Sequence, residues 1–597
     1  MAEKVLLSGN EAIARGAYEA GFHFAASYPG TPASEILETI GEQYSDVIKS
    51  QWSTNEKVAV EVAIGACYAG ARAMAAMKLV GVNVAADPLF SLSETGVNGA
   101  FVLVSADDPG MHSSQNEQDN RRYAKFAKMV LLEPSDSQEA KDFVGLAAEI
   151  SEKFDIPVMI RITTRISHSK AVVELGERKE VPIKGYTPDI KKRVVIPAHA
   201  RKLHVELEKR LLKIKEYANS VHVNRIEDGD LVIDGKKIGI VTSGISYQYA
   251  KEVFPNATYL KLGLSWPFPD KLAKKFVDMV DEVWVIEENE PFLEEELRIA
   301  ELGDKITIGK NKIPLCGELN QQIIREAILG EKAKAPQVDI SKLPARPPVL
   351  CPGCPHRGIF YVAKKLRLHG TTDIGCYTLG AIPPLEQGET CLCMGASIGV
   401  AQGLNVALGP EEGKKILAYI GDSTFYHAGL PELANVTYNK SNIVVCILDN
   451  STTAMTGHQP HPGTGVTITG EPTVKLDFYE VAKALGVKKI YRTNAYDLKE
   501  IEKALREATS TEEPAVIINQ GRCILLDWRK LDITPFTVDP EKCTGCKACL
   551  LVGCPAISID RETGKAKIDE LLCAGNHCTV CAQVCPFDAI GPMESSE

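Results

Sequence analysis

The stretch Lys415-Ile-Leu-Ala-Tyr-Ile-Gly-Asp-Ser423 is an apolar run that stops at a glycine and a carboxylate. A second run, Ile443-Val-Val-Cys-Ile-Leu-Asp-Asn450, ends in a carboxylate and an amide. Short apolar runs that are bounded by polar turn residues predict buried strands of a parallel sheet. Because ligands bind at the carboxyl ends of such strands, the two runs predict an α/β fold with a site at Asp422 and Asn450.

The two strand ends offer oxygen ligands of the kind that Mg²⁺ prefers. Their spacing resembles the thiamine diphosphate motif, Gly-Asp-Gly followed by Asn-Asn, with Ser423 in place of the last glycine and Asp449 in place of the first asparagine. The resemblance implies that Mg²⁺ is held by Asp422, Asn450 and the carbonyl group of Thr452. It also implies a set of residues around the cofactor: Gly395, Gly421, Asp422, Ser423, Asn450, Thr452, Met455 and Thr456.

A glycine-spaced segment precedes these strands and a polar loop follows them. Gly395, Gly399 and Gly403 stand four residues apart, so one face of a helix can closely approach either another helix or a diphosphate. Both alternatives remain open. The segment Thr453-Ala-Met-Thr-Gly-His-Gln459 resembles a loop of the 2-oxoacid:ferredoxin oxidoreductases, which makes His458 a candidate catalytic residue.

Thiamine diphosphate enzymes also need a carboxyl group that protonates the aminopyrimidine ring of the cofactor. The segment Asn55-Glu-Lys-Val-Ala59 opens a helix rich in alanine and glycine, which resembles the segment of the activating glutamate in these enzymes. We therefore expect Glu56 to be catalytic and to contact the cofactor. Glu61 is the alternative, and for either residue the ordinary explanation is an acid on a solvated helix face.

The substrate is expected near the N-terminal loops. Ser27-Tyr-Pro-Gly-Thr-Pro32 resembles the Tyr-Pro-x-Thr-Pro loop of the same superfamily, in which the threonine, here Thr31, lies beside the 2-oxoacid. Gly30 stands where a larger apolar residue is usual, which leaves room for an aromatic substrate. The superfamily often binds the substrate carboxylate with an arginine that we cannot place in this sequence. His112 is the candidate in its place, with a structural histidine as the alternative.

Seventeen cysteines in a long chain without an export signal indicate metal binding rather than a disulfide framework. Two runs near the C-terminus, C-x2-C-x2-C-x4-C-P from Cys543 and C-x4-C-x2-C-x3-C-P from Cys573, resemble the bacterial two-cluster ferredoxin. In that module the fourth cysteine of each run ligates the other cluster, and both runs here carry one inserted residue. The resemblance implies two [4Fe-4S] clusters, one held by Cys543, Cys546, Cys549 and Cys585, the other by Cys554, Cys573, Cys578 and Cys581. Zinc is the alternative.

Four scattered cysteines follow the order that holds a cluster near thiamine in related oxidoreductase β chains. The resemblance implies a third [4Fe-4S] cluster held by Cys351, Cys354, Cys376 and Cys523. The alternatives are free buried cysteines, or ligation by Cys391 and Cys393 instead. We expect the remaining cysteines to lie in the core: Cys67, Cys316 and Cys446.

Apolar runs alternate with amphipathic segments along most of the chain, which predicts several α/β domains with parallel sheets. We expect a pyrimidine-binding domain in residues 1–180 and a linker helix with a transketolase C-terminal-like domain in 181–335. A diphosphate-binding domain in 345–530 and a two-cluster ferredoxin domain in 533–597 complete the chain. Residues 200–219 predict an amphipathic helix, and the proline-rich residues 335–348 predict a linker.

Composition excludes several classes of protein. The 597 residues carry a formal net charge of −11, which argues against nucleic acid as a partner. The sequence has no uncharged apolar stretch of the roughly 18 residues that a membrane helix needs. The first residues lack the features of a secretory signal, so we expect a cytoplasmic protein without a membrane partner.

The order of these motifs resembles the α subunit of the indolepyruvate:ferredoxin oxidoreductase family. The resemblance implies oxidative decarboxylation of an aryl 2-oxoacid with coenzyme A and ferredoxin to an aryl-acetyl-CoA. It also implies a smaller β subunit in an α2β2 assembly. The alternatives are an oxidoreductase for another 2-oxoacid (pyruvate, branched-chain or phenylglyoxylate), a non-oxidative thiamine decarboxylase and a non-enzymatic electron carrier.

Overall fold

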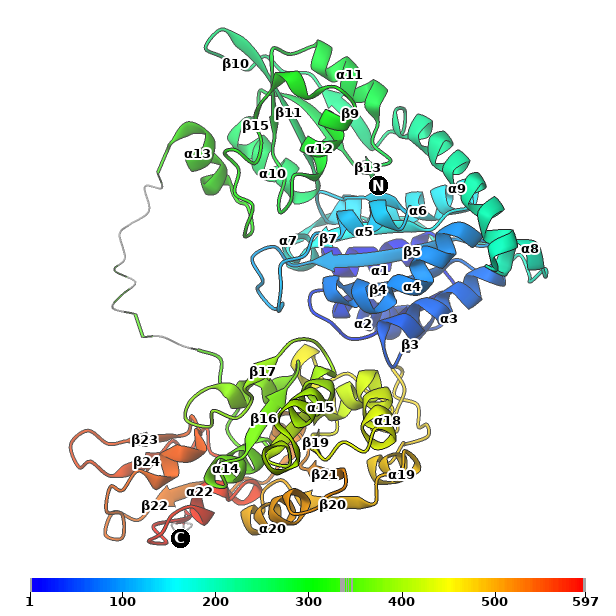
Figure 1. Cartoon of the computed structure of the whole chain (residues 1–597). Coiled ribbons are helices and arrows are strands. Elements are labelled where there is room, and N and C mark those ends of the chain that lie inside the picture. The colour runs from blue at the N-terminus through cyan, green and yellow to red at the C-terminus, as the bar shows by residue number, and fades with distance from the viewer. Residues whose placement is uncertain (1–2, 333–338, 340, 342, 345–346, 594–597) are drawn as a thin grey trace. The chain divides into compact units, whose positions relative to one another are not determined.

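The computed structural model describes residues 3–332, 339, 341, 343–344 and 347–593. The chain divides into two compact units, Met1–Val338 and Asp339–Glu597 (Figure 1). This boundary falls within the predicted linker 335–348, much of which lies outside the described residues. The first two predicted domains belong to the first unit and the last two to the second, while the boundaries within each unit remain predictions.

The larger sheet of the first unit has seven strands and is parallel except at one edge. β13 pairs antiparallel with β6, so a strand from the predicted second domain completes the sheet of the first. In spatial order the strands are β13 (Leu264–Trp266), β6 (Val130–Leu132), β7 (Val158–Thr163), β5 (Phe101–Asp107), β4 (Ala73–Lys78), β2 (Phe24–Ser27) and β3 (Lys49–Trp52). The helices of this region are α1 (Gly9–Glu19), α2 (Ser34–Gln43), α3 (Glu56–Tyr68), α4 (Leu79–Thr95), α5 (Arg121–Phe126), α6 (Ser137–Phe154) and α7 (Thr164–His168). An antiparallel pair, β1 (Lys4–Ser8) and β8 (Lys170–Glu174), accompanies them.

The second sheet of the first unit is mixed. β11 lies at its centre between β12 and β14, both parallel to it, whereas β9 runs antiparallel to β12. The strands are β15 (Ile306–Ile308), β14 (Glu282–Val285), β11 (Lys236–Ser243), β12 (Thr258–Leu262), β9 (Asn224–Glu227) and β10 (Val232–Ile233). The helices are α8 (Ile190–Arg193), α9 (Pro197–Ala218), α10 (Gly244–Val253), α11 (Asp270–Asp278), α12 (Phe292–Ile299) and α13 (Gln321–Leu329). The amphipathic helix predicted over 200–219 is confirmed as α9.

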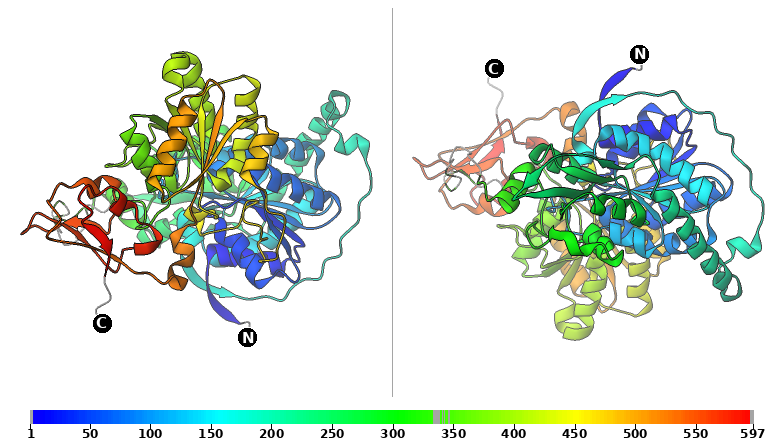
Figure 2. Two further views of the ribbon diagram at one scale, coloured as in Figure 1. Left: turned by 90° about the horizontal axis from the view of Figure 1, so that it is seen from below. Right: turned by 90° about the horizontal axis from the view of Figure 1, so that it is seen from above.

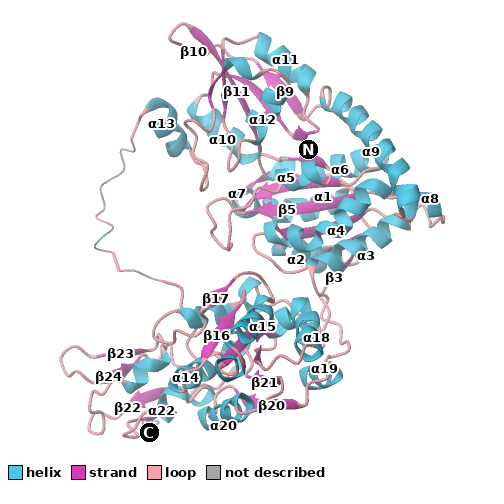
Figure 3. Cartoon of the chain, viewed as in Figure 1, coloured by secondary structure: helices cyan, strands magenta, loops and turns pink. Residues whose placement is uncertain are grey.

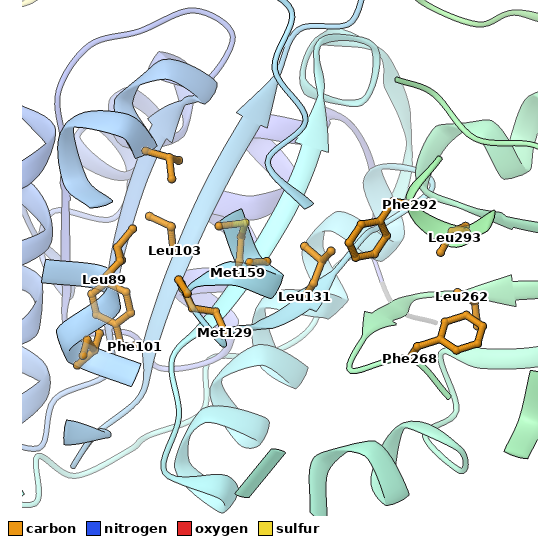
Figure 4. Close-up of a cluster of buried hydrophobic side chains, with 14 of the residues drawn as sticks. Leu89, Phe101, Leu103, Met129, Leu131, Met159, Leu262, Phe268, Phe292 and Leu293 are labelled. Carbon is orange, nitrogen blue, oxygen red and sulfur yellow. The ribbon is translucent and has the colours of Figure 1, made fainter. Parts of the chain in front are cut away.

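One hydrophobic core joins the two sheets of the first unit (Figure 4). Leu103 and Met159 come from strands of the first sheet, Leu262 from the second, and Phe292 and Leu293 from α12. Burial of large apolar side chains such as these stabilises a fold by roughly 1.5–3 kcal/mol each. The two predicted domains of this unit therefore share a core.

The second unit is built on a six-stranded sheet that is parallel throughout. The predicted strands are confirmed as β18 (Ile416–Gly421) and β19 (Val444–Asp449), each one residue later than expected. The full order is β17 (Thr390–Cys391), β16 (His369–Thr372), β18, β19, β21 (Ala515–Gln520) and β20 (Lys489–Asn494). Its helices are α14 (Arg357–Lys365), α15 (Ala396–Leu408), α16 (Pro410–Gly413), α17 (Asp422–Thr424), α18 (Leu430–Tyr438), α19 (Phe478–Ala484), α20 (Leu498–Thr509) and α21 (Ile524–Asp527).

Helices cover both faces of this sheet (Figures 2 and 3). Leu417 and Tyr419 of β18 pack in the cluster that contains residues of α14 and α20. Ile416 and Ile420, which point to the opposite face, pack with residues of α15, α18 and α19. Because successive strand residues face opposite sides, a buried parallel strand is apolar along its whole length, which explains the uninterrupted run in the sequence.

The cysteine-rich end of the chain forms two small antiparallel pairs, β22 (Phe536–Val538) with β25 (Ile590–Pro592) and β23 (Ile557–Ile559) with β24 (Ala566–Ile568). A short helix, α22 (Val580–Gln583), lies between β24 and β25 in the sequence. Cys549 and Cys573 belong to the same core as α14 and α20, and the segment of Cys549 packs against α14.

The expectation for the three remaining cysteines is only partly right. Cys67 and Cys446 are buried, in α3 and β19, but Cys316 is exposed in the loop before α13. Its apolar neighbours in the sequence do not form a strand or helix that could carry it inward. Along the described residues, no helix has both the length and the apolar character needed to cross a membrane.

Candidate functional site

The two predicted strand ends of the second unit converge on one backbone group. Oδ2 of Asp422 and Oδ1 of Asn450 both accept a hydrogen bond from the N–H of Thr452, at 3.1 and 3.2 Å. They meet because β18 and β19 are adjacent and parallel. Both side chains are buried, with 3% and 7% of their surface exposed. A carboxylate and an amide oxygen therefore lie together in a sheltered position.

The surroundings of this pair fit a bound magnesium diphosphate. The hydroxyl oxygen of Thr452 is buried and has no hydrogen-bond partner within the described part of the chain. Nε2 of His461 lies 3.1 Å from Oδ2 of Asp422. Sequence reasoning missed His461, whose only signal is its place in the loop after the second strand.

The start of α15 is held by a buried carboxylate that the sequence analysis also missed. Oδ2 of Asp373 accepts hydrogen bonds from the N–H of Gly395 at 3.1 Å and from Oγ of Ser397 at 2.9 Å. Burial raises the pKa of Asp373 to about 7. Gly395 has φ +91°, and a Cβ there would lie 2.5 Å from Cβ of Ala428. The glycine thus brings the start of α15 close to the helical turn Phe425–Gly429 that precedes α18, and Asp373 follows β16 as Asp422 follows β18.

The loop after β19 is tied back to the same turn. Oγ1 of Thr453 donates a hydrogen bond to Oγ of Ser423 at 3.0 Å, and Oγ1 of Thr456 donates to Gln459 at 2.6 Å. His458 adopts φ +70°, and burial lowers its pKa. Met455 is half-exposed, so its predicted place against the cofactor remains a prediction.

The four scattered cysteines lie together beside this site. Burial, followed by the charges of Cys523 and Cys351, raises the pKa of Cys376 to about 11. Burial is also the main cause that raises the pKa of Cys354 to about 12, with contributions from Cys376 and Cys351. The N–H of Cys523 donates a hydrogen bond to the carbonyl oxygen of Asn450 at 2.9 Å. The four predicted cysteines thus lie in one neighbourhood, next to the Asp422 and Asn450 pair.

The alternative ligands for this set, Cys391 and Cys393, are exposed. Burial, followed by the charges of Asp373 and Cys393, raises the pKa of Cys391. Burial, followed by the charges of Glu432 and Asp373, raises the pKa of Cys393. The pair therefore lies near the start of α15.

Two cavities coincide with the two predicted cysteine sets at the end of the chain. The empty space within each, open solvent included, is about 330 Å³. One is lined by Cys543, Cys546, Cys549 and Cys585, and the other by Cys554, Cys573, Cys578 and Cys581. Among the described residues, no group of three or more His, Cys, Asp or Glu side chains is arranged to hold a metal ion. A single zinc ion needs four sulfurs about 2.3 Å from it. Sulfurs that are spread around a cavity suit a larger group, such as a [4Fe-4S] cluster.

In the first unit, Glu56 and Glu61 lie in contrasting environments. Glu56 is the first residue of α3 and only 5% exposed. A Cβ on Gly81 would lie 2.8 Å from Oε1 of Glu56, so this glycine makes room for the carboxylate. Glu61 lies on the exposed face of the same helix and pairs with Lys57. Of the two acids, only Glu56 lies where solvent is excluded.

The predicted substrate loop lies against a lysine that the sequence analysis did not single out. Nζ of Lys78, at the end of β4, donates hydrogen bonds to the carbonyl and hydroxyl oxygens of Ser113. Oγ of Ser113 in turn donates to the carbonyl oxygen of Thr31 at 3.3 Å. Burial lowers the pKa of Lys78 to about 8. A Cβ on Gly30 would lie 2.9 Å from Cβ of Lys78, so the missing side chain leaves no spare room on that side.

His112, the candidate for the substrate carboxylate, has a different neighbour. Its Nε2 atom lies 3.3 Å from Oε2 of Glu318, and about half of its side chain is exposed. Arg165 also pairs with Glu318, at 2.7 Å. An acidic partner competes with a substrate carboxylate, so the better-placed cation in this region is Lys78.

Two family models match separate parts of the chain. Residues 15–216 match the family "Pyruvate flavodoxin/ferredoxin oxidoreductase, thiamine diP-bdg". Residues 373–518 match "Thiamine pyrophosphate enzyme, C-terminal TPP binding domain". A solved structure of 2-oxoglutarate:ferredoxin oxidoreductase from Magnetococcus marinus is 16% identical, covers 55% of this chain and 65% of its own, and has a TM-score of 0.45.

Curated relatives match over the whole length. Indolepyruvate oxidoreductase subunit IorA of Archaeoglobus fulgidus is 44% identical over 100% of this chain and 98% of its own. The subunit of the same name from Thermococcus kodakarensis is 43% identical with the same coverage. By this similarity, the chain belongs to the family of indolepyruvate oxidoreductase subunit IorA.

Proposed function

We propose that this chain is the catalytic α subunit of an indolepyruvate:ferredoxin oxidoreductase. The reaction converts an aryl 2-oxoacid anion, coenzyme A and two oxidised ferredoxins to aryl-acetyl-CoA, CO₂, two reduced ferredoxins and one proton. The observation that carries the proposal is the link between two sites in one unit. The side chain of Asn450 shares the N–H of Thr452 with Asp422, and its carbonyl oxygen accepts a hydrogen bond from the N–H of Cys523 in the neighbouring cysteine set.

The polar residues of the second unit supply the cofactor site in this proposal. Asp422, Asn450 and the carbonyl group of Thr452 hold Mg²⁺, and Gly395, Gly421 and Ser423 face the diphosphate. Bound thiamine diphosphate supplies a nucleophilic carbon for the ketone of the substrate and accepts the electron pair left when CO₂ departs. His458, Met455 and Thr456 are assigned to the rim of the same site.

The first unit supplies the proton and the substrate contacts. Glu56 donates and accepts the proton of the aminopyrimidine ring, a task that suits a buried carboxyl group. Thr31 orients the 2-oxoacid, and Lys78 attracts its carboxylate. A half-buried ammonium group is more effective here than in water, because the lower dielectric strengthens its attraction for an anion.

The three cysteine sets would hold [4Fe-4S] clusters, which would accept the two electrons one at a time. The set of Cys351, Cys354, Cys376 and Cys523 would supply the first acceptor, because Cys523 is bonded to Asn450. The two cavities at the end of the chain hold the others. We further propose a smaller β subunit in an α2β2 assembly, with ferredoxin as acceptor and coenzyme A as co-substrate.

The test uses the chain co-expressed with its partner subunit and purified without oxygen. We expect thiamine diphosphate, about twelve iron atoms per α chain and methyl viologen reduction that prefers indolepyruvate and phenylpyruvate over pyruvate and 2-oxoglutarate. Thiamine without iron would indicate a non-oxidative decarboxylase, and iron without thiamine an electron carrier. A preference for pyruvate would overturn the assigned substrate.

Cysteine variants test the crossed arrangement of the two terminal sets. Cys585→Ser should remove the same cluster as Cys543→Ser, because both residues line one cavity. Cys554→Ser should remove the other cluster. The exposed Cys316→Ser is the control and should retain all iron.

A further inference from the structure

Arg357 is a buried cation at the junction between two of the cysteine sets. It is the first residue of α14, three positions after Cys354, and is only 2% exposed. On one side its guanidinium donates hydrogen bonds to the carbonyl oxygens of Leu350 and Cys351. On the other side it donates to the carbonyl oxygens of Val552, at 3.0 Å, and Gly553. One side chain thus ties the loop of Cys351 to the segment that leads into Cys554.

All the hydrogen-bond acceptors that the structure describes for this guanidinium are backbone carbonyl oxygens. An ionised group away from water is costly unless an opposite charge compensates it. The charge of Arg357 acts on one thiol of each flanking set, Cys354 and Cys578. Arg357 therefore lies between two sulfur-rich sites, and its positive charge favours negative charge on either of them.

The two sets also approach each other closely at this place. Gly353, between Cys351 and Cys354, lines the cavity of the other set, and a Cβ there would lie 2.5 Å from Cβ of Ala574. The hydroxyl group of Tyr496 donates to the carbonyl oxygen of Gly353 at 2.9 Å. Gln583, two residues before Cys585, holds the carbonyl oxygen of Tyr496 at 2.6 Å. These contacts between separate segments thus fix the distance between the two cysteine sets.

We propose that Arg357 is a positioning residue for electron transfer between the cluster of Cys351, Cys354, Cys376 and Cys523 and the cluster of Cys554, Cys573, Cys578 and Cys581. Its carbonyl contacts hold the gap, and its charge stabilises the extra electron on either cluster. In each transfer the first cluster is oxidised and the second reduced by one electron. The inference rests on the iron–sulfur content proposed above.

The charge is tested with the α–β complex by EPR-monitored redox titration without oxygen. Arg357→Met removes the charge and should lower the midpoint potential of each flanking cluster by at least 59 mV. This shift corresponds to a tenfold change in the one-electron equilibrium constant. The cluster of Cys543, which Arg357 does not contact, should keep its potential. The exposed Arg492→Met in the same unit is the matched control and should change none. If the methionine variant loses iron, Arg357→Gln, which keeps amide donors without the charge, replaces it.

The spacing is tested with Arg357→Lys, which keeps the charge but cannot bind both segments at once. The potentials should stay near those of the wild type, while the magnetic coupling between the two reduced clusters weakens. Full iron content with unchanged potentials in the uncharged variant would overturn the proposal, as would unchanged coupling in the lysine variant. A wild-type complex without iron would instead overturn the proposed function.

Discussion

The side chains of Asp422 and Asn450, at the ends of two adjacent parallel strands, accept hydrogen bonds from one backbone N–H. That N–H belongs to Thr452, whose own hydroxyl oxygen is buried without a partner in the described residues. The strand ends thus create a compact set of oxygens. This relationship supports assigning a magnesium diphosphate to the second unit.

Asp422→Asn should weaken binding of thiamine diphosphate with Mg²⁺ by at least about tenfold, because it removes the only carboxylate that faces Thr452 among the described residues. Calorimetric titration of the apo-complex measures the change. Asp449→Asn is the matched control, since Asp449 instead accepts from Ser451 and Gln520. Equal losses in both variants would contradict the assignment.

Glu56→Gln should lower turnover by about 10²–10⁴-fold while the fold persists, because an amide of the same shape cannot transfer the proton. Glu61→Gln, on the exposed face of the same helix, should stay within about twofold of the wild type. Steady-state methyl viologen reduction with indolepyruvate provides the measurement. Loss of activity in the second variant and not the first would reverse the assignment.

Gly30→Ile should lower turnover of aryl 2-oxoacids more than turnover of pyruvate, with a difference of about tenfold or more. A Cβ at this position would lie 2.9 Å from Cβ of Lys78, so the isoleucine side chain must turn away from Lys78 and into the space where we place the larger aryl group of the substrate. The ratio of kcat/KM for phenylpyruvate and pyruvate tests it. Equal losses on both substrates would show that Gly30 is needed for the local backbone structure and not for substrate selection.

Asp373 should make stability depend on pH. Burial raises the pKa of its carboxyl group from 3.8 to about 7. The fold therefore accepts the neutral carboxyl group at acid pH but pays for its ionisation, and the free energy of unfolding falls as the pH rises from about 4 to 7. Asp373→Asn does not titrate, so its stability relative to the wild type should rise between pH 4 and pH 8, by up to about 4 kcal/mol. Denaturant unfolding of the apo-protein at both pH values measures this difference. A difference that does not change between pH 4 and pH 8 would contradict the raised pKa.

The strands and their ends could be predicted because a buried parallel strand has a local signal. Ile416–Gly421 is apolar throughout, and the glycine and carboxylate that follow mark its end. The two terminal cysteine sets could be predicted from the resemblance to a two-cluster ferredoxin, which implies that the fourth cysteine of each run joins the other set, and the same residues line the two cavities.

Other features depend on contacts between distant segments. Lys78 meets Ser113, Asp373 meets Gly395, and neither pairing has a local pattern. The edge strand β13 has only three residues, too few for a period to emerge, and it pairs with β6 far earlier in the chain. Cys316 was assigned to the core from its apolar neighbours, but tertiary packing leaves its loop exposed.

The central claim is that carbon–carbon cleavage of an aryl 2-oxoacid delivers electrons to clusters held by the same chain. Rapid-freeze EPR of the oxidised α–β complex after mixing with indolepyruvate and coenzyme A tests it most directly. The account predicts that signals of reduced [4Fe-4S] clusters grow within the time of one turnover and require the substrate. Clusters that dithionite reduces but that stay oxidised with indolepyruvate would contradict it.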